Sequence, residues 1–117
     1  MPVTLLAQFR RPYGGDNALT TFLGRYEAEH LPLIATVPGL RSMTVSRVVH
    51  SYTAEADLVL VNQMVFDDRA SLDAAMASEP MRRAGRNLRE IAPGLLTLVV
   101  LEETGATNVP VMDPEAP

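Results

Sequence analysis

Residues 58–66, with the sequence LVLVNQMVF, show the clearest strand pattern in the chain and decide its fold. They are rich in β-branched and apolar residues, and they lead directly into Asp67 and Asp68. An aspartate at such a position is a common helix N-cap, so a helix is expected next. Residues 58–61 are apolar at every position, whereas a strand with one wet face alternates apolar and polar residues. We therefore expect this strand to be covered on both faces.

Two predicted strands and one predicted helix come before this segment. Residues 41–50 alternate between apolar and polar side chains, which is typical of a half-buried strand. Residues 3–9 form a short apolar run that ends at two arginines and a glycine-rich turn, and they also predict a strand. Between the two, Asp16 can cap a helix that runs to about Glu29, because prolines and a glycine follow at 32–39. One core-facing stripe of this helix consists of Leu19, Phe22, Leu23 and Tyr26.

A second helical region and a last strand follow residues 58–66. Asp67 or Asp68 can cap a helix, Pro80 interrupts it, and a continuing helix comes after the interruption. Its core-facing positions are Leu72, Ala75, Met76, Met81, Ala84, Leu88 and Ile91. Residues 95–101, LLTLVVL, predict the last strand. The resulting order is β-α-β-β-α-β.

This order predicts an α+β fold of the ferredoxin-like type, an antiparallel four-stranded sheet with two helices on one face. Two helices can cover only one side of such a sheet. Residues 58–61 and 98–101 are apolar on both sides, so the second side needs a cover as well. We expect a homodimer in which two sheets pack through their open faces and form a dimeric α/β barrel. The alternative is a monomer whose strands are merely very apolar.

The composition limits the functions that are open to the chain. It has 117 residues and a net charge of −4, which suits one domain, expected at 1–104, followed by an arm or flexible tail at 105–117. All ten basic residues are arginines, a usage typical of GC-rich bacterial genomes, and lysine, cysteine and tryptophan are absent. This excludes a Schiff-base lysine, a cysteine nucleophile and a thiolate metal site. An acidic chain is also a poor nucleic-acid binder.

No membrane partner, metal or cofactor is expected. No apolar run approaches the ~18 residues that span a bilayer, and the start of the chain lacks the basic region of a signal peptide, so we expect a cytoplasmic protein. Glu27 and His30 have a spacing that occurs in di-metal carboxylate sites. Such sites need a second copy, but Arg47 stands three residues before His50. Glycine-rich phosphate-binding motifs are absent.

A few polar residues in apolar settings are the candidate site residues. His30 continues the apolar stripe of the first helix, so it is either a general acid/base at a cleft or a histidine that bonds the last carbonyls of the helix. His50 is expected to be an exposed residue at a strand end. Asn62 and Gln63 interrupt an apolar strand and point to opposite faces, where they bind a ligand or bridge to a neighbouring strand through Gln8 or Thr97. Tyr13 either rims a pocket or is an ordinary turn residue.

Three segments resemble the EthD-like proteins of the dimeric α/β-barrel superfamily. They are FRRPYGGD at 9–16, FLGRYEAEHLPLIATVPGL at 22–40 and LVNQMVFDDRASLDAAMAS at 60–78. The similarity extends over about residues 5–100, and its most specific part is the string from Tyr26 and His30 to Leu40. It implies a ferredoxin-like protomer, a homodimer packed through its sheets and a cleft between sheet and helices. His30 matches the histidine of that family.

The resemblance also suggests what the protein does. Members of the family include an auxiliary protein of ether degradation, a muconolactone isomerase and polyketide-modifying dehydratases or cyclases. We expect a hydrophobic or oxygenated small molecule to bind near His30, with cofactor-free proton transfer if the protein is an enzyme. Tyr26, Tyr13 and the amides of Asn62 and Gln63 would bind the substrate. One alternative is a non-catalytic auxiliary protein, and another is a cofactorless or haem-linked monooxygenase, although the lack of tryptophan disfavours the haem form.

Overall fold

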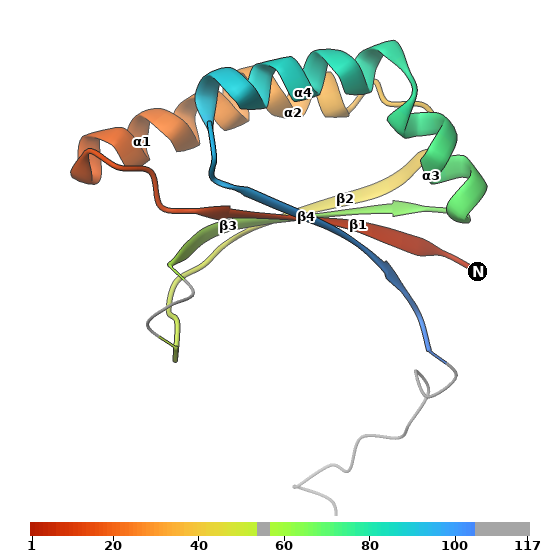
Figure 1. The fold of residues 1–117 in the computed structure, drawn as a ribbon, viewed down its shortest axis with the longest axis horizontal. Helices are drawn as coiled ribbons and strands as arrows, with labels where there is room; N and C mark the ends of the chain where they lie inside the picture. Colours follow the sequence, from red (N-terminus) through yellow and green to blue (C-terminus); the bar gives the residue numbers. More distant parts are fainter. Residues whose placement is uncertain (54–56, 105–117) are drawn as a thin grey trace, which may run out of the picture.

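The computed structural model describes residues 1–53 and 57–104 of the chain. The predicted tail at 105–117 lies outside the described residues. Along the chain the elements are β1 (Val3–Arg10), α1 (Gly15–Arg25), the π-helical turn η1 (Tyr26–His30), α2 (Leu31–Ile34), β2 (Leu40–Arg47), β3 (Leu58–Phe66), α3 (Arg69–Met76), α4 (Glu79–Ile91) and β4 (Leu96–Glu102). Figure 1 shows these elements in two layers, a helical layer above a twisted sheet.

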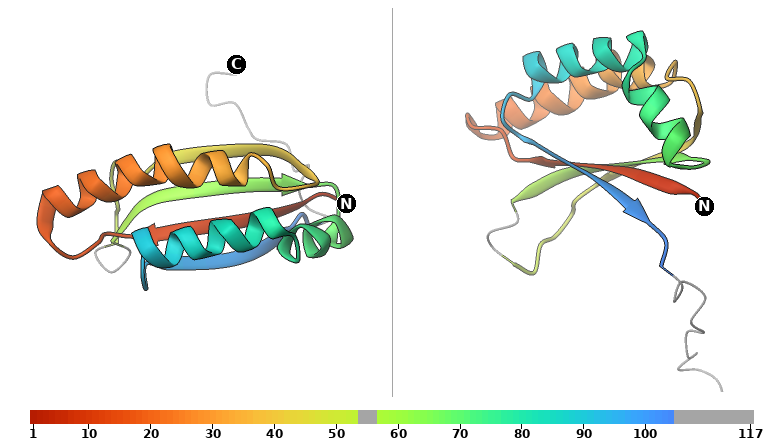
Figure 2. Two further views of the ribbon diagram at one scale, coloured as in Figure 1. Left: turned by 90° about the horizontal axis from the view of Figure 1, so that it is seen from above. Right: turned by 45° about the vertical axis from the view of Figure 1, so that its right-hand side comes forward.

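The sheet has the strand order β2-β3-β1-β4, and all neighbouring strands are antiparallel. The two long helical segments lie on the same face, with α1 and α2 over β2 and β3, and α4 over β1 and β4 (Figure 2). This arrangement confirms the predicted ferredoxin-like α+β fold. Among the described residues, no helix is long and apolar enough to cross a membrane.

The core lies between the sheet and the helices. Alternate residues of β1 are buried, namely Val3, Leu5, Ala7 and Phe9, as expected for side chains that point to one face of a strand. In β3 the buried side chains of Leu60, Asn62, Met64 and Phe66 stand next to them in register. The helices contribute Phe22, Tyr26, Ile34, Leu72, Ala75, Ala84 and Ile91. The polar Asn62 therefore lies in the middle of an otherwise apolar layer.

The first helix continues further than the sequence predicts. Its end was expected near Glu29, but the chain continues through η1 and α2 to Ile34. In η1 the backbone N–H of Leu31 donates to the carbonyl of Tyr26, five residues back. Pro32 lies in the first turn of α2, where the missing N–H of a proline is tolerated. The widened π-helical turn thus lets the helix pass the proline that was expected to end it.

The second helical region is interrupted at the place that the sequence predicts. Of the two candidate caps, Asp68 accepts a hydrogen bond from the backbone N–H of Ser71 at 2.8 Å and begins α3, while Asp67 pairs with Arg41. Ser78 then caps α4 by accepting from the N–H of Met81. Since α4 starts with its own cap, the two helices are separate elements rather than one kinked helix.

The second strand is shorter than predicted. β2 ends at Arg47, and the last bond to β3 runs from the N–H of Val48 to the carbonyl of Val59. Val49 and His50 lie beyond this bond and are exposed, so Val49 does not belong to the buried face of the strand as expected. The ring of His50 instead lies against that of Tyr52, with the centroids 4.7 Å apart.

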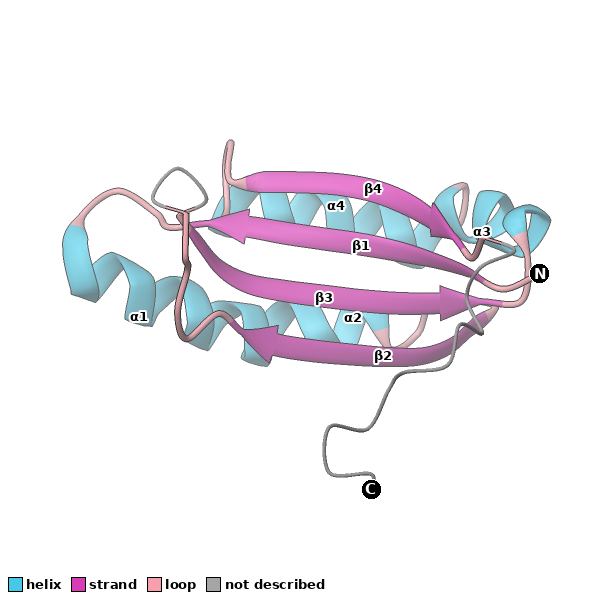
Figure 3. Ribbon diagram, turned by 90° about the horizontal axis from the view of Figure 1, so that it is seen from below, coloured by secondary structure: helices cyan, strands magenta, loops and turns pink. Residues whose placement is uncertain are grey.

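The face of the sheet opposite the helices is bare in the described part of the chain (Figure 3). In its central rows Leu6 stands beside Gln63 of β3 and Val99 of β4. In β4 the apolar Val99 and Leu101 point to this face and are 40% and 45% exposed, while Leu98 and Val100 between them point to the helix side. The apolar pattern that suggested a cover on both faces therefore corresponds to an exposed apolar surface in β4, whereas in residues 58–61 Val59 and Leu60 are buried within the single chain.

Candidate functional site

A small cleft lies between the sheet and the helices η1 and α4. Its volume is about 120 Å³, and its lining is apolar apart from the side chains of Tyr26 and His30. Three methionines, Met64, Met76 and Met81, form part of the wall. Methionine is flexible and polarisable, so such a wall can adapt to ligands of different shape. The cleft therefore combines an adaptable apolar surface with two polar rings.

The π-helical turn η1 holds these two rings together. Tyr26 is its first residue and His30 its last, and both side chains are buried. Their ring centroids lie 4.9 Å apart. The ring of Tyr26 also packs against Phe9 and Phe22, at 5.2 and 5.9 Å between centroids. π-Helical turns within α-helices occur frequently at functional sites, and here the turn sets the position of the one buried histidine of the chain.

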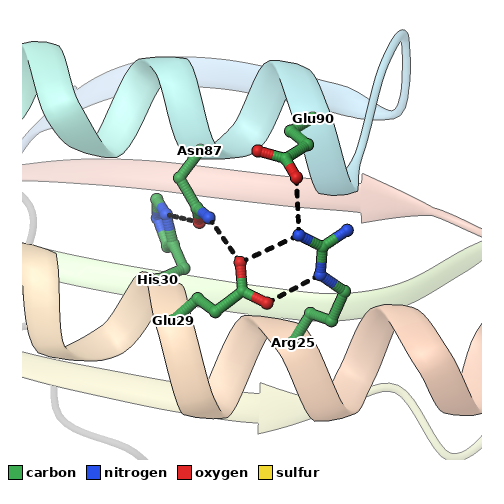
Figure 4. A network of polar contacts seen from close by, with 5 residues as sticks. All are labelled: Arg25, Glu29, His30, Asn87 and Glu90. Atoms are coloured by element: carbon green, nitrogen blue, oxygen red, sulfur yellow. Dashed lines mark hydrogen bonds and ion pairs between the residues drawn. The ribbon is translucent and has the colours of Figure 1, made fainter.

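A chain of polar contacts leads from the protein surface to His30 (Figure 4). Arg25 donates to the carboxylate of Glu29 at 2.6 Å and to that of Glu90 at 2.7 Å. The amide Nδ2 of Asn87 donates to Glu29 Oε1 at 3.0 Å. At the inner end, Nδ1 of His30 lies 3.2 Å from Oδ1 of Asn87. The contacts thus join η1 to α4 across the top of the cleft.

This chain determines which nitrogen of His30 bears the proton. The carboxylate of Glu29 can only accept, so it orients the amide of Asn87 with Nδ2 toward it. Oδ1 of Asn87 then faces His30 and also can only accept, so Nδ1 of His30 must carry the hydrogen. Nε2 is left with a free lone pair. The network therefore prepares Nε2 as a hydrogen-bond acceptor or base.

The surroundings of His30 keep it neutral. Only 3% of the residue is exposed, and burial lowers its pKa from 6.5 to about 4, although the bond to Asn87 acts in the opposite direction. At neutral pH the imidazole is uncharged, and Nε2 is available to a donor. Glu29, which anchors the network, also has a lowered pKa, chiefly because Arg25 donates to its carboxylate. The ion pair and the neutral imidazole can therefore coexist at pH 7.

The second polar ring is bonded to the amide of the central strand. Nδ2 of Asn62 donates to the hydroxyl oxygen of Tyr26 at 2.8 Å. Burial raises the pKa of Tyr26 to about 12, so the phenol stays protonated. Among the described residues, Oδ1 of Asn62 has no hydrogen-bond partner although the atom is buried. Asn62 and Tyr26 thus support the wall of the cleft on its sheet side, and the acceptor Oδ1 of Asn62 is left without a donor.

Comparison with solved structures decides the family. The structure of an EthD family protein from Bacillus halodurans C-125 superposes with a TM-score of 0.78 at 35% identity, over 89% of this chain and 100% of that one. The chain belongs to the EthD family. No protein-family model and no curated protein sequence matches it.

Two more distant structures share the fold of this EthD family protein. One is a dimeric ferredoxin-like protein of unknown function from Jannaschia sp. CCS1, with a TM-score of 0.65 at 20% identity over 88% of this chain and 100% of that one. The other is a DABB family protein with a ferredoxin-like fold from Mesorhizobium loti MAFF303099, with a TM-score of 0.66 at 11% identity over 89% and 98%. At these identities the likeness shows the fold alone.

Three of the site residues that the sequence of this chain predicts lie close together. His30 and Tyr26 line the cleft, and Asn62 bonds to Tyr26 beneath it. Gln63 points to the bare face of the sheet, and Tyr13 is 98% exposed on the glycine-rich turn, where it borders other hollows. The structure does not bring these two side chains to His30.

Two interpretations that compete with a ligand site find no support in the contacts. One alternative makes His30 a residue that bonds the last carbonyls of its helix, but His30 is followed by α2 and bonds to Asn87. Likewise, Asn62 does not bridge to Gln8 or Thr97, because its amide bonds to Tyr26. Within residues 1–53 and 57–104, no group of three or more acidic or histidine side chains could hold a metal ion.

Sequence reasoning missed the residues that orient His30. Arg25 and Glu29 stand four apart on one helix, a spacing that favours an ion pair, and this signal was available in the sequence. Asn87 lies 57 residues away from His30, so its contact depends on how α4 packs against η1. A lone amide in a helix carries no signal for such a contact.

Proposed function

We propose that this EthD family protein binds a small, mainly apolar molecule with an oxygen function in the cleft beneath η1 and α4. The observation that carries the proposal is the neutral, buried His30, whose Nε2 is left as an acceptor by the Asn87 contact. A hydroxyl, enol or phenol of the ligand would donate to this nitrogen. The apolar lining would hold the rest of the molecule by burying its surface.

The same arrangement supports proton-transfer chemistry without a cofactor. A ligand donor that bonds to Nε2 can pass its proton to the imidazole, and the imidazolium can return it to another atom of the ligand. Isomerisation, dehydration and cyclisation need such a shuttle. Tyr26, a protonated phenol in the same cleft, would help to hold the ligand's oxygen.

A non-catalytic auxiliary role is the second candidate, and one observation favours it. A general base works best when its pKa lies near the operating pH. The pKa of His30, about 4, makes it a weak base at neutral pH. A weak base can still accept a hydrogen bond, so binding without turnover fits the site as well.

The test compares two histidine variants. Binding of phenol is measured by calorimetry, and turnover of small lactones by product analysis, for the wild type, His30→Ala and His30→Gln. His50→Ala is the matched control, because His50 is exposed and outside the cleft. We expect both His30 variants to lose binding at least tenfold and the control to keep it. Equal affinity in all four proteins would refute the proposed function, while binding without turnover supports the auxiliary role.

We also propose that two copies of the chain pair through the bare face of the sheet. Apolar side chains lie exposed there, including Val99 and Leu101 of β4. A structural neighbour from Jannaschia sp. CCS1 is a dimeric protein with the same fold. Burial of this face would remove the exposed apolar surface from water.

A further inference from the structure

The volume of the cleft limits what can fit inside it. At about 120 Å³ it is slightly smaller than the engineered protein cavity of roughly 150 Å³ that holds one benzene molecule. A ligand larger than a single ring must therefore extend out of the cleft, and the direction in which it leaves determines the class of molecule that binds.

A second hollow adjoins the cleft along the outer edge of the sheet. Its volume is about 240 Å³, and it lies between the C-terminal half of α4 and the start of β4. Gly85, Leu88 and Leu96 belong to the lining of both hollows. β4 is an edge strand that runs beneath α4 (Figure 3). A molecule that follows Gly85, Leu88 and Leu96 out of the cleft would therefore reach the surface.

Gly85 stands where the two hollows meet. Glycine is unfavourable in the interior of a helix, and its place in α4 therefore calls for a local reason. Packing within the protein does not supply one, since a Cβ atom built at this position would meet only Nη1 of Arg89, at 3.9 Å. The missing side chain keeps free the space between the cleft and the outer hollow.

Arg89 places a positive charge beside this passage, with Nη1 3.9 Å from the position that a Cβ of Gly85 would take. It follows Gly85 by four residues, so both lie on one face of α4, about 6 Å apart along the axis. Its side chain lines the outer hollow. The neighbouring Arg82, Arg83 and Arg86 all pair with Glu79, whereas Arg89 has no ion pair or hydrogen bond to any part of the chain that the structure describes.

We propose that the cleft continues past Gly85 and takes an elongated carboxylate, whose oxygenated ring end lies at His30 and whose carboxylate pairs with Arg89. The placement of the ring end at His30 depends on the proposed function of the cleft. The apolar middle of the ligand runs between Leu88 and Leu96. Gly85 thereby sets the length of the ligand, and Arg89 selects its charge.

A series of 4-hydroxyphenyl alkanoates tests this proposal, with phenol and the neutral 4-alkylphenols as reference probes. The phenol group suits His30, the chain length varies, and only the alkanoates carry a charge. For the wild type we expect affinity to rise about fourfold for each methylene that becomes buried, up to an optimum length. At that length the alkanoate should bind up to about fivefold more tightly than the neutral probe, as expected for an exposed ion pair.

Three variants separate the parts of the proposal. Gly85→Leu should bind phenol like the wild type but lose the gain with chain length, and Gly85→Ala, which has room for its methyl group, should reduce that gain. Arg89→Gln should keep the length dependence and lose the preference for the charged probes. Thermal unfolding of each variant shows whether it is folded. If Gly85→Leu does not fold, the length dependence of Gly85→Ala alone tests the passage.

The outcomes also distinguish this inference from the proposed function. An unchanged length dependence in both Gly85 variants would mean that the ligand leaves at the other end of the cleft, past Met76 and Leu98, and would overturn the inference. Equal binding of charged and neutral probes by the wild type would overturn the role of Arg89. An affinity for phenol that is unchanged in His30→Ala, while the length and charge dependence remain, would instead refute the proposed function. Failure of every probe to bind the wild type would refute both.

Discussion

Asn87 and His30 lie 57 residues apart in the sequence, and their side chains meet with Oδ1 3.2 Å from Nδ1. Because Glu29 fixes the other end of the Asn87 amide, this contact fixes the tautomer of the histidine as well as its orientation. The availability of Nε2 as a hydrogen-bond acceptor therefore depends on α4, although the histidine itself belongs to η1. Asn87 is a positioning residue in the proposed site.

Replacement of Asn87 by aspartate should raise the pKa of His30. The variant is made in a Glu29→Gln background, because Glu29 Oε1 lies 3.0 Å from Nδ2 of Asn87 and two carboxylates at this distance would not both be ionised. It then places a carboxylate beside Nδ1, and a nearby negative charge favours the imidazolium. We expect the midpoint of the His30 titration, measured by NMR, to rise by more than one pH unit from its value of about 4. Asn17→Asp, on the exposed first turn of α1, is the matched control and should leave the midpoint in place. An unchanged midpoint in Asn87→Asp would show that the contact does not form in solution.

Stability should fall as the pH is lowered from about 6.5 toward 4. The folded protein keeps His30 neutral while the unfolded chain binds a proton near the usual pKa of 6.5, so the unfolded state gains protons first. By pH 5 this costs about 2 kcal/mol relative to pH 7. Carboxylates with a lowered pKa, such as Glu29 and Asp67, lose their contribution only below about pH 4.5.

Urea unfolding at pH 7, 6 and 5 measures this effect. His30→Gln removes the titrating group, so the free energy of unfolding of this variant should change less over the same range. If the wild type and His30→Gln lose stability in parallel between pH 7 and 5, the histidine is not buried in its neutral form.

The fold was largely predictable because its elements depend on local patterns. The alternation predicted for residues 41–50 corresponds to β2, which ends at Arg47, and the largely apolar run in 58–66 corresponds to β3. The cap of α3 could be anticipated from the aspartates, and a break near Pro80 from the proline, whereas the cap of α4 at Ser78 was not predicted. These signals involve neighbours within a few residues, so the sequence alone displays them.

The site was only partly predictable because its parts depend on tertiary packing. Spacing placed Tyr26 and His30 on one buried stripe, which the structure confirms. The spacing of the residues did not predict the π-helical turn. Pro32 predicted that the helix ends, and not that its pitch changes. The contact with Asn87 forms only when α4 packs beside η1. Tyr13 and Gln63 do not lie at the cleft, and their roles in binding a ligand stay predictions.

Loss of the Tyr26 hydroxyl should destabilise the protein through Asn62. In Tyr26→Phe the buried Nδ2 of Asn62 has no acceptor left, which costs about 1–3 kcal/mol. Asn62→Leu removes the same bond from the other side. In the double variant both groups are apolar, so its loss of stability should be smaller than the sum of the two single losses. Urea unfolding gives the three values, with Tyr52→Phe, at an exposed tyrosine, as the control. Additive losses would contradict a direct bond.

A charge in the middle of the bare sheet face should separate the proposed dimer. Leu6 stands between Gln63 and Val99 on this face, so Leu6→Glu would place a carboxylate in the contact between two sheets. A buried charge without a partner is strongly unfavourable, whereas the same carboxylate on a free surface is not. We expect sedimentation equilibrium to give the mass of two chains for the wild type and of one chain for Leu6→Glu, with unchanged circular dichroism. Val49→Glu, at an exposed position outside the sheet, should stay dimeric. A wild type that sediments as one chain at micromolar concentration would contradict pairing through this face, and a dimeric Leu6→Glu would place the contact elsewhere.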